Sequence, residues 1–122
     1  MQFKTFMETQ NDLDRLVGEL QKRFQGVRIS AWENHHKVEL DLIQVPPEMQ
    51  NRGIGSEILK ELKKHAQLVQ KPIVVRPSAD AGKKSALARF YDRNGFVKNT
   101  GKNLDFSLSS PFAATRYWKA SP

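Results

Sequence analysis

The chain has 122 residues, of which 39% are hydrophobic and 27% charged, so we expect one soluble globular domain over residues 1–122. No apolar run approaches the roughly 20 residues that a membrane helix needs, which excludes such a helix. The absence of cysteine excludes disulfides, a thiol nucleophile and thiolate metal sites. Lys and Arg exceed Asp and Glu by 20 to 13, and the net charge of +7 predicts either an acidic protein or nucleoprotein partner or nothing beyond solubility.

The first half of the chain predicts a strand, a helix and a hairpin. The stretch MQFKTFM at residues 1–7 predicts a short edge strand, and because it has neither a basic nor an apolar leader segment we expect a cytoplasmic protein. Apolar residues at helical spacing predict a helix over residues 8–24. The alternating stretches VRISAWE (27–33) and KVELDLIQV (37–45) predict an antiparallel hairpin, with Val38, Leu40 and Leu42 on one side.

The second half predicts strands and helices in alternation. Prolines 46 and 47 end the hairpin, and apolar residues from Ile54 to Val69 predict the next helix. KPIVVRP predicts a buried strand, SADAGKK a loop, and the spacing of Leu87, Phe90 and Tyr91 another helix that ends at Asn94-Gly95. Short strands are expected at residues 96–97 and in TRYWKA, with a loop or irregular strand between them. One right-handed crossover around the 54–69 helix would give an α+β (α/β-like) fold.

Two glycines one residue apart occur in QNRGIGSEIL (50–59), where a helix must begin. Each costs roughly 0.5–1 kcal/mol relative to Ala inside a helix, so geometry or a ligand must require them. The first N–H groups of a helix lack intrahelical partners and the helix dipole adds positive charge there, which favours a phosphate. Gly53 and Gly55 would let a pyrophosphate approach the backbone, Arg52 would add charge, and Ser56 could donate a hydrogen bond.

Two common phosphate-binding loops do not fit this stretch. A Walker-type loop needs Lys and then Ser or Thr after its last glycine, whereas Gly55 is followed by Ser56-Glu57. The dinucleotide fingerprint needs a third glycine, and Ile58 stands at that position.

The stretch VELDLIQVPPEMQNRGIGSEIL resembles motif A of the GCN5-related N-acetyltransferase (GNAT) superfamily, in which Gln or Arg is followed after two residues by Gly and then by Gly or Ala. Gln50, Gly53 and Gly55 satisfy this signature. LARFYDRNGF resembles motif B, with the aromatic pair Phe90-Tyr91 shortly before Gly-Phe. The motifs lie at about residues 38–70 and 83–97, in the family's order and spacing.

The resemblance implies a central mixed, mostly antiparallel sheet, splayed in the middle and flanked by about three helices, with acetyl-CoA in the opening and no metal. Backbone groups near Ile43 and Val45 would pair with the pantetheine amides. The pyrophosphate would be held by the loop residues Gln50, Asn51, Arg52, Gly53, Ile54, Gly55 and Ser56.

The chain departs from the family pattern in three places. One helix stands where the family has two in its N-terminal part. Many family members have an Asn that contacts the cofactor at the position of Lys84. Ser85 could take over that contact, and Lys83 or Lys84 could bind the 3′-phosphate of the cofactor. The C-terminal segment is short for the family and leaves little material for an acceptor pocket.

Acetyl transfer to an amine needs a base, because an alkylammonium has a pKa of about 10.4, and an acid helps a thiolate to leave. Tyr91 is the expected acid, by resemblance and because a phenol stays protonated at neutral pH, although it could merely pack on Phe90. Glu39 and Asp41 are the candidate bases, since alternation puts both opposite Leu40. Glu39 matches the glutamate of the histone-acetylating members, but a solvated face with water as the base is equally consistent.

These residues predict an acetyl-CoA-dependent N-acetyltransferase, monomeric or homodimeric, in which a primary amine attacks the thioester directly. The acceptor is left open between a protein lysine, a protein N-terminus and a small amine. The alternative is a catalytically inactive acyl-CoA- or nucleic-acid-binding module with the same fold. His35-His36 lacks further metal ligands nearby and predicts no metal site, and His65 is expected to be solvated. The sequence does not decide whether three aromatic residues lie in the core or at the acceptor site, namely Trp32, Tyr117 and Trp118.

Overall fold

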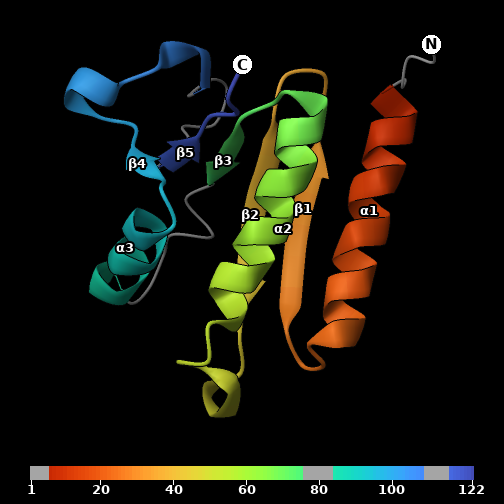
Figure 1. The fold of residues 1–122 in the computed structure, drawn as a ribbon. Coiled ribbons are helices and arrows are strands. Elements are labelled where there is room, and N and C mark those ends of the chain that lie inside the picture. Colours follow the sequence, from red (N-terminus) through yellow and green to blue (C-terminus); the bar gives the residue numbers. More distant parts are fainter. Residues whose placement is uncertain (1–5, 76–83, 109–115) are drawn as a thin grey trace.

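The structure is a computed structural model that describes residues 6–75, 84–108 and 116–122. Figure 1 shows α1 and α2 side by side over one face of a sheet. The elements are, in chain order, α1 (Phe6–Arg23), β1 (Arg28–Glu33), β2 (Val38–Gln44), η1 (Pro47–Met49), α2 (Ile54–Val69), β3 (Ile73–Val75), α3 (Lys84–Arg93), β4 (Val97–Lys98), η3 (Gly101–Asn103), η4 (Phe106–Leu108) and β5 (Arg116–Trp118).

Within the described residues, the sheet has five strands in the order β1-β2-β3-β5-β4. Only β2 and β3 are parallel, and the other neighbours are antiparallel. The expected mixed, mostly antiparallel sheet of an α+β fold is therefore confirmed, as are the hairpin and the crossover that carries α2 between two parallel strands.

The pairing of β2 with β3 covers only part of β2. It runs from Val38–Ile73 to Leu40–Val75, whereas β2 continues to Gln44 beside β1. Among the described residues, the second half of β2 thus has no strand on its β3 side. Figure 1 shows α3 at the level of this half, below the end of β3. This opening is the expected splay.

A β-bulge changes which residues of β2 face the core. The register shifts so that Ser30 pairs with Leu42 and Ala31 with Leu40, which leaves Asp41 as the extra residue. Paired residues point to the same face, and Ile43 pairs with the buried Ile29. The prediction that Leu42 continues the core face is therefore wrong, because the bulge puts Ile43 there instead.

The main core lies between the sheet and the helices α1 and α2. Each fully buried Leu or Ile stabilises the fold by about 1.5–3 kcal/mol, and the core is rich in both. Its buried residues are Leu13, Leu20, Val27, Ile29, Val38, Leu40, Ile58, Leu59, Leu62, Ala66, Ile73, Val75, Tyr91 and Phe96. We call the other side of the sheet its back face. There η4 covers the sheet with a smaller cluster of Val74, Leu108 and Tyr117.

Two local expectations need correction or fall outside the structure. The strand expected at residues 1–7 is wrong at Phe6 and Met7, which begin α1, and residues 1–5 lie outside the described residues. The stretch expected as a loop or irregular strand after residue 99 contains the short helices η3 and η4 up to Leu108. Most of the SADAGKK loop also lies outside the described residues.

Candidate active site

A pocket of about 290 Å³ opens where β2 ends and α2 begins. We call it the loop pocket. Eight of the residues that the sequence predicts at a cofactor line it, namely Ile43, Val45, Gln50, Asn51, Gly53, Ile54, Gly55 and Ser56. One side of α3 closes the pocket opposite the loop. The splay and the glycine loop therefore meet at one concave site.

The loop has a backbone shape that few residues allow. Asn51 and Gly53 have φ values of 64° and 75°, in the left-handed region that glycine enters freely and Asn tolerates better than most residues. Gln50 Nε2 donates to the Val45 carbonyl oxygen at 3.0 Å and closes the loop on itself. Gly53 caps α2 without a side-chain hydrogen bond, so the first N–H groups of the helix face the pocket without a cap.

The two glycines serve different purposes. A Cβ on Gly53 would meet nothing within 4 Å, so this residue is needed for its positive φ. A Cβ on Gly55 would lie 2.9 Å from Phe90 Cε1, closer than real Cβ contacts. Gly55 therefore lets the Phe90 ring of α3 pack directly on the first turn of α2. Of the two reasons that the sequence left open, geometry and a ligand, the packing geometry requires Gly55.

Sequence reasoning missed four lining residues: Met49, Leu87, Phe90 and Arg93. The signal was present, because Leu87, Phe90 and Arg93 are three residues apart and share one face of α3. Arg93 brings a positive charge to the pocket. It also lines an adjoining cavity of about 540 Å³ with Lys60, Lys63 and Glu57, so the charged residues on the outer side of this site are mostly cationic.

The end of α3 is tied to the start of α2. Asn94 Nδ2 donates to Ser56 Oγ at 3.1 Å and to the Phe90 carbonyl oxygen at 2.8 Å. Lys63 also donates to the Asn94 carbonyl oxygen, and burial lowers the pKa of Lys63. These contacts hold the Ser56 hydroxyl beside the loop, where its proton can still be donated.

Four residues that were predicted to contact the cofactor are not placed in the pocket. Arg52 is exposed and does not line it. Lys84 and Ser85 begin α3, but their side chains lie outside the described residues, as does all of Lys83. Their expected contacts stay predictions.

Tyr91 lies behind the pocket wall. Its side chain is only 1% exposed, and its ring centroid is 5.2 Å from that of Phe90 and 5.7 Å from that of Phe96. Phe90, not Tyr91, lines the loop pocket. The packing that we considered as the alternative is thus present, and the role of Tyr91 as an acid stays a prediction.

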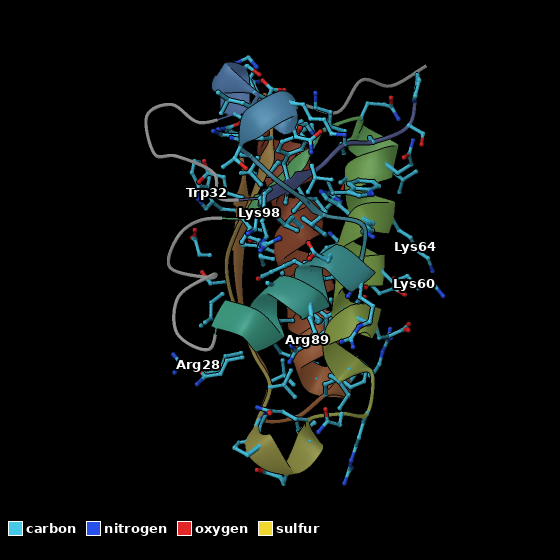
Figure 2. All side chains as sticks on the ribbon, turned by 90° about the vertical axis from the view of Figure 1, so that its left-hand side faces the viewer. Arg28, Trp32, Lys60, Lys64, Arg89 and Lys98 are labelled. Carbon is cyan, nitrogen blue, oxygen red and sulfur yellow. The ribbon has the colours of Figure 1, made fainter. Side chains whose placement is uncertain are left out.

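A second and larger cavity, of about 870 Å³, opens on the back face. We call it the back-face pocket. The sheet register places Trp32, Glu39, Val74 and Tyr117 in one row across four strands, and Trp32 and Glu39 line the cavity. Figure 2 shows Trp32 on the side of the sheet away from α1 and α2. Its other walls come from residues near positions 70–72, from η4 and from residues 119–120.

The two candidate bases have different surroundings. Glu39 is 7% exposed, so it is not on a solvated face, and its Oε1 lies 3.6 Å from Lys37 Nζ. Asp41 is half-buried at the bulge, where simple alternation no longer places it with Glu39. Glu39 stands beside the last paired row of β2 and β3, and its role as a base stays a prediction.

Trp32 and the C-terminal aromatic residues separate in the structure. Trp32 is 39% exposed at the back-face pocket, whereas Tyr117 is buried beneath η4 and Trp118 packs on the main core. Tyr117 donates a hydrogen bond of 2.6 Å from its hydroxyl to the Asn103 carbonyl oxygen. Of the three, Trp32 is the most exposed, and Trp118 is partly buried.

A buried polar network adjoins the back-face pocket, which two of its members, Asn34 and Lys71, line. Glu33, fully buried at the end of β1, accepts hydrogen bonds from Lys71 Nζ at 2.5 Å and His65 Nε2 at 2.6 Å. Lys71 also donates to the Asn34 carbonyl oxygen at 2.8 Å. Burial raises the pKa of Glu33, but the bonds from Lys71 and His65 outweigh it and hold that pKa below its ordinary value. The expectation that His65 is solvated is wrong, because Glu33 holds its ring.

His35 and His36 lie near each other, with ring centroids 6.5 Å apart. In the described part of the chain, no group of three or more His, Cys, Asp or Glu side chains could hold a metal ion. Within the same residues, no helix combines the length and the apolar character needed to cross a membrane.

Comparison with known proteins agrees with the fold and the motifs. A family model described as an acetyltransferase (GNAT) domain matches residues 11–98. The crystal structure of the anti-CRISPR protein AcrVA5 has a similar fold, with a TM-score of 0.57 and 24% identity over 77% of this chain and 90% of that chain. Among curated proteins, the sequence search finds no match. The family model spans most of the chain and both motifs, and the chain belongs to the GNAT acetyltransferases.

Proposed function

We propose that the protein is an acetyl-CoA-dependent N-acetyltransferase that acetylates a primary amine by direct attack on the thioester. The observation that carries this proposal is the loop pocket, in which the end of β2, the glycine loop and the start of α2 converge. Domains of this family use acetyl-CoA. When bound, acetyl-CoA supplies an acetyl group activated as a thioester.

The residues present fit a diphosphate. The uncapped N–H groups of α2, the positive end of its dipole and the Ser56 hydroxyl are donors on one wall. Arg93 adds a full charge beside them, and no side chain on Gly53 fills the space. The backbone of β2 near Ile43 and Val45, on the side where β3 has ended, is suited to pair with amides of an extended arm.

The proton transfers are assigned to side chains near the splay. We assign the removal of a proton from the amine to Glu39, directly or through water, because it is buried at the edge of the opening. Tyr91 is assigned as the proton donor to the leaving sulfur. Its burial behind Phe90 means that it would have to act through a small shift of the Phe90 ring.

The proposal is tested by calorimetric titration with acetyl-CoA, followed by a CoA-release assay on a panel of amines, peptides and proteins. Arg93→Glu should weaken acetyl-CoA binding at least about tenfold, since a hydrogen bond to a charged group contributes about 1.5–3 kcal/mol. Arg28→Glu changes the charge equally on β1, outside the loop pocket and on the side of the sheet away from α1 and α2 (Figure 2), and should bind as the wild type does. Wild-type protein that neither binds acetyl-CoA nor releases CoA would refute the proposal.

The amine panel includes nucleoproteins. The charge of +7 favours acidic partners, and the name of the structural neighbour, an anti-CRISPR protein, suggests CRISPR effectors as acceptors worth including. The same charge favours the alternative, an inactive module that binds nucleic acid. Such a module would bind oligonucleotides with a steep salt dependence and would release no CoA.

A further inference from the structure

We propose that the back-face pocket binds an unpaired nucleobase, which stacks on Trp32. Such a base belongs either to a single strand of nucleic acid or to a free nucleotide, two sources that a titration distinguishes. The site does not depend on the proposed acetyl transfer, and its occupant would leave the loop pocket open to its own ligand.

The back-face pocket lies at the end of the sheet away from the splay. Its walls include residues 34–37, 70–72 and 119–120, which are close to the end of β1 and to the starts of β2 and β3. The splay opens at the other ends of β2 and β3, after the pair Leu40–Val75. Among the described residues, none lines both this pocket and the loop pocket. The back-face pocket is therefore a second site, separate from the one proposed for the cofactor.

Trp32 offers a flat apolar surface to this pocket. Of the large apolar side chains that are exposed in the described part of the chain, it is the only aromatic one, with 39% of its surface accessible. In its row across the sheet, η4 covers Val74 and Tyr117, whereas Trp32 stands at the open side. An exposed indole of this kind is a platform on which any base can stack.

Two side-chain amides of the lining are held in one orientation. Asn34 Oδ1 accepts hydrogen bonds of 2.8 and 2.9 Å from the backbone N–H groups two and three residues later, which leaves its Nδ2 hydrogens for a ligand. Gln70 Nε2 donates to the carbonyl oxygens of Gln67 and Ser121 at 2.9 and 3.0 Å, which leaves its Oε1 as an acceptor. The pocket thus has an oriented donor and an oriented acceptor, and amides of this kind pair with the edges of nucleobases.

The charges at the pocket are matched, so its interior suits a neutral ring. Each lysine of the lining faces a carboxylate: Lys37 with Glu39 at 3.6 Å, Lys71 with Glu33 at 2.5 Å and Lys119 with Asp105 at 2.9 Å. A phosphate in the interior would meet these carboxylates, whereas a base carries no net charge. The excess of positive charge in this +7 chain therefore lies outside the pocket, where it can attract phosphates.

Exposed cations stand where the backbone of a bound strand would leave the pocket. Arg28 projects from the same face of β1 as Trp32, about 13 Å along the strand (Figure 2). The Lys119 side chain is 59% exposed at the rim. Each can neutralise a phosphate. A stacking platform with a few phosphate contacts is the usual means by which proteins hold single-stranded nucleic acid.

The test is a titration with three probes: a single-stranded oligonucleotide of about ten nucleotides, the same sequence as a duplex, and a nucleoside monophosphate. Anisotropy of the labelled strand gives the affinity, and quenching of tryptophan fluorescence reports stacking. The single strand should quench the fluorescence and bind at least about tenfold more tightly than the duplex, whose bases are already paired and stacked. A monophosphate that binds as tightly as the strand would assign the site to a free nucleotide, and weaker binding would assign it to a strand.

Two pairs of variants place the binding in the pocket. Trp32→Ala should weaken single-strand binding about tenfold, which corresponds to about 1.4 kcal/mol of lost stacking, and Trp32→Phe should restore it to within about threefold. The matched control is Leu68→Ala, which removes an 85% exposed apolar side chain outside the pocket and should bind as the wild type does. Asn34→Asp keeps the acceptor of the turn but loses the Nδ2 donor, and should weaken binding about fivefold. Ser30→Asp adds the same charge on β1 outside the pocket and should weaken it by less than about twofold.

Three results would overturn the proposal. Duplex binding as tight as that of the single strand would mean that charge alone attracts nucleic acid. Unchanged binding by Trp32→Ala, or an equal loss in Leu68→Ala, would remove Trp32 as the platform. Binding of neither the strand nor the monophosphate would exclude a base from the pocket. None of these results bears on acetyl transfer, which the CoA-release assay measures separately.

Discussion

Replacing Glu33 by Gln removes the one negative charge at the centre of the network with His65 and Lys71. The side chain is fully buried, and Lys71, with 12% of its side chain exposed, would keep a charge without its carboxylate partner. Removal of one member of a buried pair costs about 3–5 kcal/mol. The Gln amide oxygen can still accept one of the two hydrogen bonds, so we expect the lower end, about 3 kcal/mol.

Thermal and urea unfolding measure this loss. For a chain of this size, 1 kcal/mol corresponds to about 4 °C in Tm, so Glu33→Gln should melt about 12 °C below the wild type. The matched control is Glu61→Gln, which removes the partner of Lys64 at 3.4 Å, where the Lys64 side chain is 62% exposed. An exposed pair of this kind should contribute at most about 0.5 kcal/mol.

The same variant should change the dependence of stability on pH. The folded pKa of Glu33 is below its unfolded value, so its contribution is complete above the unfolded pKa of about 4.3 and is lost as the pH falls through the folded pKa. The stability difference between wild type and Glu33→Gln should therefore be constant above about pH 5 and shrink in more acidic solution. A loss below 1 kcal/mol at pH 7, or a difference that grows toward acid, would refute the reasoning.

Three further variants probe the loop and the aromatic cluster. Gly55→Ala should destabilise the protein by about 1–3 kcal/mol, because the new Cβ would press on Phe90. The control is Gly18→Ala, whose Cβ would meet nothing within 4 Å and which should stabilise α1 by about 0.5–1 kcal/mol. Equal melting temperatures for the two variants would contradict the packing explanation. Gly53→Ala should lose about 1–2 kcal/mol from its positive φ, and an unchanged Tm would show that the loop adopts another backbone shape. Tyr91→Phe should lower kcat in the CoA-release assay with unchanged affinity for acetyl-CoA, and full turnover would remove Tyr91 from the mechanism.

The sequence predicted the loop pocket well because its residues are close together in the chain. The strand, the glycine loop and the helix start follow one another from Val38 to Leu59, and local rules of turns and helix ends apply to each of them. Periodicity also placed α2 and α3 correctly. The geometry of a contiguous motif of this kind depends mainly on its own residues, so it can be predicted from the sequence.

The bulge could not be predicted from alternation. The stretch VELDLIQV fits one face through Val38, Leu40 and Leu42, and equally fits a face that changes to Ile43 after an inserted residue. Apolar residues occupy both sets, so only the pairing with β1 decides between them.

The back-face pocket could not be predicted from the sequence, for a different reason. Its walls come from β1, β2, η4 and the last residues of the chain, and partners such as Glu33 and Lys71 are 38 residues apart. A charged residue at the end of a strand is expected to be exposed to solvent, and its burial cannot be predicted unless its partners far along the chain are known. The C-terminal segment supplies Lys119 and Ala120 to this pocket.

The loop pocket and the back-face pocket have no lining residue in common and open on opposite faces of β2. The cysteine-free chain has no thiol to carry an acyl group, so the proposed transfer is direct from donor to acceptor. Double-reciprocal plots at several fixed donor concentrations should then intersect rather than run parallel, as for a ternary complex in which both reactants are held at once.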